Sequence, residues 1–142
     1  MVVYLDTSSL VKLYVEEEDS SKIADLVRSS KVAATSLIAY PEARAAFARR
    51  FRENAFTPGE YKHLISVFDK DWENYLIVRV TKELVRLAGN LAEKHGLRAF
   101  DAIHLSSAII LHAEISAPLI FSCSDRKLQQ ASNLEGLDQP EQ

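Results

Sequence analysis

The stretch VVYLDTSSLVKL, residues 2–13, contains an apolar run, a cluster of small polar residues and a second set of apolar residues. The run at residues 2–5 is β-branched and aromatic, and we predict that it forms a buried strand. The polar cluster at residues 6–9 consists of residue types that cap helices, so a short helix is expected next. A buried strand followed at once by a helix is the first unit of an α/β pattern.

The rest of the chain continues this alternation of strands and helices. Further strands are predicted over residues 31–34, 75–80 and 119–122. Helices are predicted over residues 20–28, 58–72, 99–114 and 125–132, and between Thr81 as N-cap and Gly96 as the terminal glycine. Because the strands are apolar throughout and helices separate them, we expect a small parallel sheet covered on both faces. This fold is a three-layer α/β/α sandwich.

Proline marks the beginning of two further segments. Residues 57–60, TPGE, combine a cap, a proline at the first helical position and a glutamate placed for a capping box. Thr35 and Ser36 are predicted to cap a long helix that runs to about Glu53. Pro41 lies within that pattern and predicts either a kink near Tyr40 or a helix that begins at the proline.

The composition is that of an ordinary globular protein, with 26% charged and 47% hydrophobic residues in a chain of 142. We expect one domain over residues 1–134 and a flexible tail over 135–142. A single cysteine, Cys123, excludes an internal disulfide and a cysteine-rich zinc site. No apolar run is long enough to span a membrane, and the opening residues lack a secretory signal pattern, so we expect a cytoplasmic protein.

The net charge of −3 argues against a protein that coats nucleic acid without regard to sequence, because such proteins are usually strongly basic. It does not exclude an enzyme that acts on nucleic acid at one local site.

Four acidic residues are predicted to converge at one edge of the sheet. Asp6 follows the first strand and Asp125 follows the last, while Asp101 lies in the first turn of the helix over 99–114. Glu42 lies near the start of the helix after the second strand. Sites in parallel sheets form beyond the carboxyl ends of the strands. Two carboxylates ~4 Å apart repel each other by about 4 kcal/mol, and a hard cation such as Mg²⁺ or Mn²⁺ removes this repulsion.

Each acid also has a simpler interpretation when it is taken alone. Asp6 and Asp125 fit as N-caps, and Glu42 fits as a first-turn acid that interacts with the helix dipole. Asp101 is harder to explain in this way, because its helix otherwise has the pattern of a buried one. The prediction of a site therefore depends on the shared placement of the four residues.

Four motifs resemble those of PIN-domain proteins, specifically the VapC toxins of VapBC toxin–antitoxin pairs. The first two, LDTSSLVKLY (residues 5–14) and LRAFDAIHLSSA (residues 97–108), are specific when taken together. FSCSDRKL (residues 121–128) resembles the last acidic motif, and PEARAA (residues 41–46) resembles the segment that carries the family glutamate. The resemblance spans residues 2–132.

The resemblance implies a PIN fold and an endoribonuclease that depends on Mg²⁺ or Mn²⁺. The acidic catalytic site of the family corresponds to Asp6, Glu42, Asp101 and Asp125, with Asp6, Asp101 and Asp125 as metal ligands. The resemblance also implies an RNA substrate, a cognate VapB-like antitoxin and a homodimer.

Hydroxyl groups are expected around these acids. The family has a small hydroxylated residue beside the first aspartate, which corresponds to Thr7 or Ser8. It often has threonine or serine two positions before the last aspartate, where this chain has Cys123. Ser124 or Ser122 is a candidate for that outer-shell hydroxyl.

Two arginines are candidates for contacts with RNA phosphates. Arg49 lies two helical turns beyond Glu42, and Arg98 precedes Asp101 by three residues at the expected mouth of the site. A solvated helix face explains Arg49 equally well, and an ion pair with a nearby acid also explains Arg98. His104, one turn beyond Asp101, is interpreted as a core histidine.

Three functions compete on these observations. The leading one is the metal-dependent endoribonuclease, in which an activated water attacks a phosphodiester. The second is a catalytically silent PIN-like module that binds RNA or protein. The third is a phosphatase with Asp6 as nucleophile, a chemistry that usually needs a second aspartate where this chain has Ser8.

Overall fold

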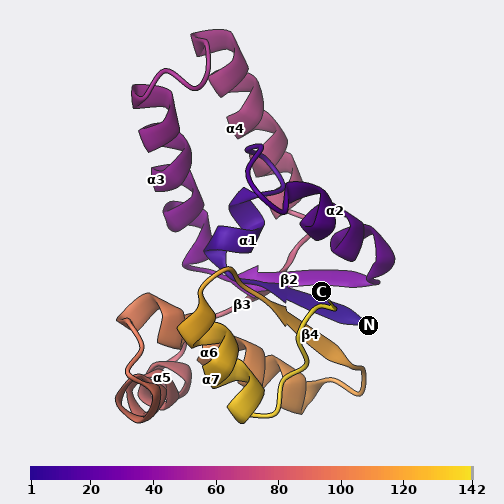
Figure 1. Cartoon of the computed structure of the whole chain (residues 1–142), viewed down its shortest axis with the longest axis vertical. Coiled ribbons are helices and arrows are strands. Elements are labelled where there is room, and N and C mark those ends of the chain that lie inside the picture. The colour runs from indigo at the N-terminus through magenta and orange to yellow at the C-terminus, as the bar shows by residue number, and fades with distance from the viewer. Residues whose placement is uncertain (142) are drawn as a thin grey trace.

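The computed structural model of the chain describes residues 1–141. It contains a four-stranded sheet in the order β3-β2-β1-β4, and all neighbouring strands pair in parallel (Figure 1). The strands are β1 (Val2–Leu5), β2 (Val32–Ser36), β3 (Leu76–Val78) and β4 (Leu119–Ser122). The helices are α1 (Thr7–Val11), α2 (Ser20–Ser29), α3 (Ala39–Arg52), α4 (Pro58–Trp72), α5 (Lys82–His95), α6 (Ala99–Glu114) and α7 (Arg126–Leu134).

Strand β1 lies in the middle of the sheet and is buried along its whole length. Its side chains alternate between the two faces, as the geometry of a strand requires. Val2 and Tyr4 belong to a hydrophobic core with residues of α5, α6 and α7. Val3 and Leu5 belong to a second core with residues of α1, α3 and α4. This division explains why the strand is apolar throughout and confirms the predicted parallel sheet covered on both faces.

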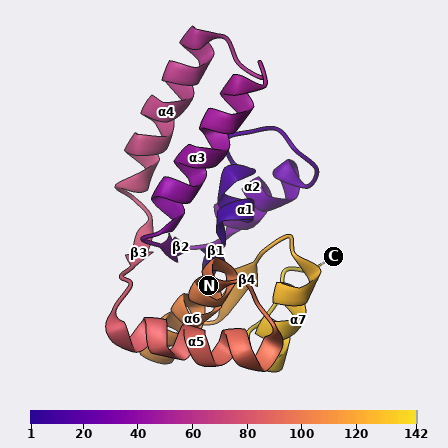
Figure 2. The same ribbon diagram turned by 90° about the vertical axis from the view of Figure 1, so that its left-hand side faces the viewer.

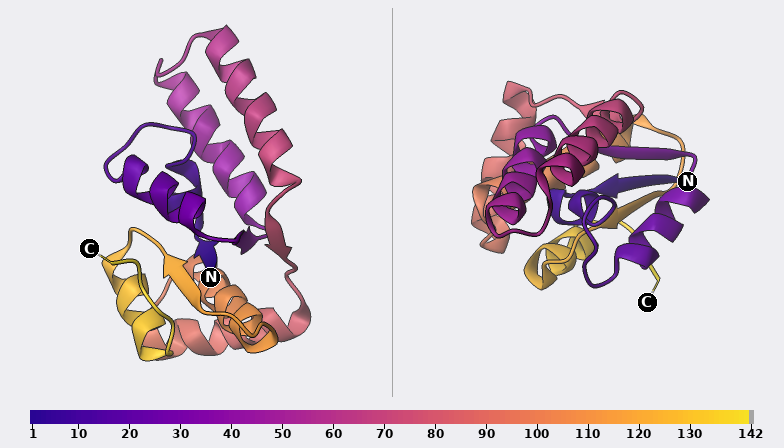
Figure 3. Two further views of the ribbon diagram at one scale, coloured as in Figure 1. Left: turned by 90° about the vertical axis from the view of Figure 1, so that its right-hand side faces the viewer. Right: turned by 90° about the horizontal axis from the view of Figure 1, so that it is seen from above.

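The helices form two layers around the sheet. Helices α5, α6 and α7 lie on one face and α1 to α4 on the other, as two perpendicular views show (Figures 1 and 3). Helices α3 and α4 form a hairpin that projects away from the sheet (Figure 2). The three-layer α/β/α sandwich predicted from the sequence is therefore confirmed. No helix within residues 1–141 is both long and apolar enough to cross a membrane.

Aromatic packing fixes the α3–α4 hairpin to the body of the molecule. Phe68 of α4 is fully buried, and its ring lies 5.2 Å from that of Phe47 in α3 and 5.1 Å from that of Tyr14. Tyr40 stacks on Phe68 at 5.4 Å, and Trp72 packs against it at 5.9 Å. The capping box predicted for the start of α4 is present, with Thr57 as the N-cap.

Two element boundaries differ from the sequence prediction. Thr35 and Ser36 belong to β2 and do not cap α3, because the Thr35 hydroxyl donates instead to the backbone carbonyl of Leu5 at 2.7 Å. Helix α3 begins at Ala39, and Pro41 falls in its first turn, where a missing N–H is tolerated. The predicted strand over 75–80 is reduced to β3, since its partner β2 ends at Ser36, which pairs with Val78.

The segment predicted to be a flexible tail lies partly against the core. Leu137 is only 3% exposed and belongs to the core beneath the sheet. The Asp138 carbonyl accepts a hydrogen bond from the Phe121 amide at 2.8 Å, beside β4. The packed part of the chain therefore extends to Asp138, beyond the predicted boundary at residue 134. Gln142 lies outside the described residues.

We predict that Phe68→Ala lowers the free energy of unfolding by about 3–5 kcal/mol, because it leaves a cavity among four aromatic rings. Chemical denaturation of the two proteins measures this difference. The control is Leu134→Ala, since Leu134 is 75% exposed, and its expected effect is within about 0.5 kcal/mol. An equal effect of the two substitutions would show that the aromatic cluster does not hold the hairpin.

Truncation after Glu135 should lower the free energy of unfolding by about 2–4 kcal/mol, because it removes the buried Leu137 side chain and the hydrogen bond to Phe121. Truncation after Gln139 keeps both contacts and should change stability by less than about 0.5 kcal/mol. Thermal or urea unfolding of the three chains measures the difference. If truncation after Glu135 left the free energy of unfolding unchanged, the folded domain would end at residue 134 as the sequence predicted.

Candidate active site

Asp6 lies where β1 passes into α1, and the residue is only 4% exposed. Its Oδ1 accepts hydrogen bonds from the Ser8 hydroxyl at 2.7 Å and from the Ser9 amide at 2.9 Å. The predicted role as N-cap of the first helix is therefore present. Burial raises the pKa of Asp6 above its ordinary value, and neighbouring His104 and the hydrogen bonds offset this only in part. A buried carboxylate of this kind is stabilised by a cation.

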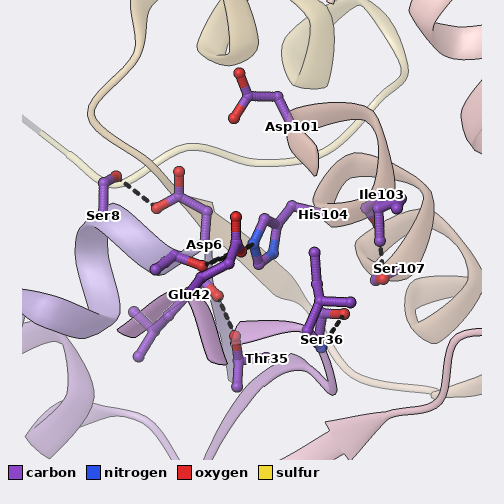
Figure 4. A network of polar contacts seen from close by, with 12 residues as sticks. Asp6, Ser8, Thr35, Ser36, Glu42, Asp101, Ile103, His104 and Ser107 are labelled. Carbon is purple, nitrogen blue, oxygen red and sulfur yellow. Dashed lines mark hydrogen bonds and ion pairs between the residues drawn. The ribbon is translucent and has the colours of Figure 1, made fainter. Parts of the chain in front are cut away.

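Asp101 and Asp125 reach the same edge of the sheet from different elements. Asp101 lies in the first turn of α6 with its side chain 17% exposed, on the same side of the sheet edge as Asp6 (Figure 4). Asp125 caps α7 and accepts a hydrogen bond from the Leu128 amide at 2.9 Å. Burial chiefly, and then the charges of Asp6, Asp125 and Asp101, raise the pKa of the Cys123 thiol. Burial and these charges therefore keep Cys123 in the unreactive thiol form.

Glu42 enters the site from the first turn of α3. Its Oε1 accepts a hydrogen bond from the Thr7 hydroxyl at 2.5 Å and lies 3.0 Å from Nε2 of His104. Burial acts to raise the pKa of Glu42, but the hydrogen bonds from His104 and Thr7 outweigh it and hold the pKa below its ordinary value. Glu42 is therefore ionised at neutral pH.

His104 is 2% exposed, as expected of a core histidine, but both ring nitrogens have polar partners. Its Nδ1 lies 2.8 Å from the Tyr4 hydroxyl, and its Nε2 lies 3.0 Å from the Thr7 hydroxyl as well as from Glu42. Sequence reasoning missed this link to the site. The available signal was the spacing of three residues from Asp101, which places both side chains on one face of α6.

Ser8 connects the loops that follow β1 and β4. Its hydroxyl donates to Asp6 and accepts a hydrogen bond from the Ser124 amide at 3.3 Å. Ser124 therefore contributes its backbone to this link. The hydroxyl of Ser122 lies 2.9 Å from that of Ser9, in the buried layer beneath Asp6. The hydroxyls that the sequence placed near the acids are thus present on Thr7, Ser8 and Ser122.

The two candidate arginines occupy different surroundings. Arg98 is 82% exposed on its side chain, and its Nε donates to Asp101 Oδ2 at 3.0 Å. It lies at the mouth of the acidic group and makes the ion pair that the simpler interpretation predicted. Arg49 is exposed on α3, two turns from Glu42 along the projecting hairpin. The structure therefore places Arg98, but not Arg49, beside the acids.

The carboxylates converge without forming a closed metal cage. Among residues 1–141, no three acidic, histidine or cysteine side chains lie close enough together to bind one ion as they stand. The donor chemistry nevertheless fits a hard divalent ion. Within the described residues, Asp6 Oδ2, Asp101 Oδ1 and Asp125 Oδ1 accept no hydrogen bond. Mg²⁺ commonly binds one or two carboxylates directly and keeps several waters, so carboxylates that do not close around it can still hold it, in part through those waters.

Comparison with known proteins identifies the family. The PIN domain family matches residues 3–134. Ribonucleases VapC45 and VapC49 of Mycobacterium tuberculosis strains are each 34% identical over 139 residues, covering 95% of this chain and 92% of theirs. Ribonuclease VapC46 of the same species is 28% identical over 135 residues.

Solved structures share the fold at low sequence identity. A chain of FitAcB from Neisseria gonorrhoeae has a TM-score of 0.67 and 14% identity, covering 98% of this chain and 96% of its own. A chain of VapBC2 from Rickettsia felis, bound to a DNA fragment from their promoter, has a TM-score of 0.64 and 16% identity. This match covers 98% of this chain and 97% of that chain. With the PIN-domain match over residues 3–134 and relatives at 34% identity along nearly the whole length, the chain belongs to the PIN-domain family of VapC-type ribonucleases.

Proposed function

We propose that the protein is a divalent-metal-dependent endoribonuclease, the toxin of a type II toxin–antitoxin pair, acting in the cytoplasm. The observation that carries the proposal is the buried carboxylate of Asp6, which shares one edge of the sheet with Glu42, Asp101 and Asp125. The names of its VapC relatives support RNA as the substrate.

The aspartates have a common role in this proposal. Asp6, Asp101 and Asp125 would hold the ion, and each has one carboxylate oxygen without a hydrogen bond among the described residues. When bound, Mg²⁺ or Mn²⁺ supplies the positive charge that activates water and stabilises charge on the phosphate. The Ser8 hydroxyl and the Ser9 amide keep the Asp6 carboxylate oriented through its other oxygen.

Glu42 has a separate role because its hydrogen bonds hold it in the ionised form. Both of the side-chain hydrogen bonds that Glu42 makes within residues 1–141 go to Oε1, so Oε2 is available to accept a proton or a hydrogen bond from the attacking water. A carboxylate with this freedom suits a general base or an orienting group. Thr7 holds Glu42 in place by donating its hydroxyl.

Arg98 is the residue best placed to meet an RNA phosphate at the mouth of the site. Its exposed guanidinium already pairs with Asp101, so an RNA phosphate would replace Asp101 as the partner of Arg98. Arg49 would contact RNA only where the substrate extends along α3. We also propose a VapB-like antitoxin as partner, which the VapBC2 structure among the structural neighbours supports. A homodimer as the assembly rests only on the resemblance to VapC toxins.

Asp101→Asn should lower the rate of RNA cleavage by about a hundredfold or more, because it removes a charged ligand at the reacting centre. EDTA should abolish cleavage by the unmodified protein, and Mn²⁺ should restore it. The control is Asp25→Asn, since Asp25 lies on α2 and is 72% exposed on its side chain. Gel assays on purified RNA measure cleavage, and calorimetry measures Mn²⁺ binding.

Two results would contradict the proposal in different ways. Cleavage that survives both EDTA and Asp101→Asn would exclude a metal nuclease built on this residue. An unmodified protein that neither cleaves RNA nor binds Mn²⁺ would instead support the silent binding module.

Asp6→Asn separates the catalytic role of Asp6 from its role as a helix cap, because asparagine caps a helix as well as aspartate does. We expect cleavage to be lost, while the free energy of unfolding in EDTA at neutral pH rises. The sign follows from the raised pKa, since the folded state disfavours the ionised carboxylate that neutral pH imposes. Urea unfolding in EDTA measures the change, and full activity in this variant would leave Asp6 with a capping role alone.

A further inference from the structure

We propose that His104 is a positioning residue that orients the Glu42 carboxylate, and that Tyr4 fixes the imidazole ring for this purpose. This inference rests on the proposed function, because it concerns how Glu42 is presented to the reacting atoms. It assigns a role to a buried polar group that the acidic site itself leaves unexplained.

The contacts join four elements of the fold, and Figure 4 shows Glu42 and His104 side by side at their centre. Tyr4 on β1 places its hydroxyl 2.8 Å from Nδ1 of His104 on α6, and Nε2 of the same ring lies 3.0 Å from Oε1 of Glu42 on α3. Thr7 completes the group from α1, with its hydroxyl 3.0 Å from Nε2 and 2.5 Å from Glu42. The sheet and the helices on both of its faces are therefore joined at this point.

The hydrogen bonds between His104, Thr7 and Glu42 allow only one assignment of donors and acceptors at Glu42. An ionised carboxylate only accepts hydrogen bonds, so Nε2 of His104 must carry the proton. Both side-chain hydrogen bonds of Glu42 within residues 1–141 converge on Oε1. Two donors on one oxygen fix the rotation of the carboxylate and leave Oε2 without a hydrogen bond to the described residues.

The ring of His104 is itself held rigidly. Tyr4 is fully buried, packs edge-on against His104 with ring centres 5.9 Å apart, and stacks on Phe121 at 5.5 Å. Burial raises the pKa of Tyr4 well above its ordinary value, so its hydroxyl stays protonated. A phenol in this position holds the ring and donates to Nδ1 when Nε2 carries the only ring proton.

An apolar residue at position 104 would fill the core without the cost of burying a polar ring. The surrounding residues of α6 are apolar or small, and the ring is 2% exposed. The only charged partner of His104 within the described residues is Glu42. The hydrogen bonds from Tyr4 through His104 to Glu42 therefore run from the core to the site, as a positioning role requires.

A double-mutant cycle tests the inference. His104→Asn keeps a polar group near Tyr4 but cannot reach Glu42, whereas the amide of His104→Gln can reach it. We expect His104→Asn to lower kcat about tenfold or more with little change in KM, and His104→Gln to retain most of the rate. In the Glu42→Ala background, measured by single-turnover cleavage with excess enzyme, His104→Asn should cause no further loss.

A matched control separates positioning from stability. Ser106 is equally buried on α6, and its hydroxyl donates to the Leu84 carbonyl at 2.8 Å, away from Glu42. Ser106→Ala should lower the melting temperature and leave kcat unchanged. Equal rates for His104→Asn and His104→Gln, or the same loss from His104→Asn with and without Glu42, would overturn the inference.

A measurement without catalysis distinguishes failure of this inference from failure of the proposed function. ¹⁵N NMR of the imidazole reports which ring nitrogen carries the proton. We expect the proton on Nε2 in the unmodified protein, and loss of its protection from exchange in Glu42→Ala. An unprotonated Nε2 overturns the positioning role even if RNA is cleaved, whereas a protonated and protected Nε2 supports it even if the activity proves to be different.

Discussion

The buried carboxylate of Asp6 is the constraint around which the rest of the site is arranged. It lies at the end of the central strand, where the chain has no freedom to move the group into solvent without breaking the start of α1. Hydrogen bonds from Ser8 and Ser9 satisfy one oxygen, but burial still disfavours the charge. Burying this carboxylate therefore costs stability, and carboxylates with shifted pKa values of this kind are common at functional sites.

Strand β1 connects the Asp6 site to the packing of the whole molecule. Because its side chains alternate, the strand contributes to both hydrophobic cores at once. Tyr4 extends to His104 on one side of the sheet, while Thr7, just after the strand, meets Glu42 from α3 on the other. The acids are thus carried by elements that pack on opposite faces and meet only at the edge of the sheet. Their spacing depends on the packing of all three layers.

The sequence predicted those parts of the structure that depend on local signals. Strands β1 and β4 are apolar runs with clear ends, and Thr57 and Thr81 cap their helices as expected. The expectation that the acids share one edge of the sheet came from the parallel topology and from the family resemblance. The length of β3 could not be predicted in this way, because it is set by where β2 ends. The contacts of His104 could not be predicted either, because its partners Tyr4 and Glu42 lie 100 and 62 residues away along the chain.

The position of Glu42 at the base of the projecting hairpin has a mechanical consequence. Helix α3 rises about 1.5 Å per residue, so from its start at Ala39 Glu42 lies about 4.5 Å along the axis and Arg52 about 20 Å. A small tilt of the hairpin about that base displaces Arg52 roughly four times as far as Glu42. A tilt of the hairpin would therefore move its tip while the carboxylate near its base hardly moves.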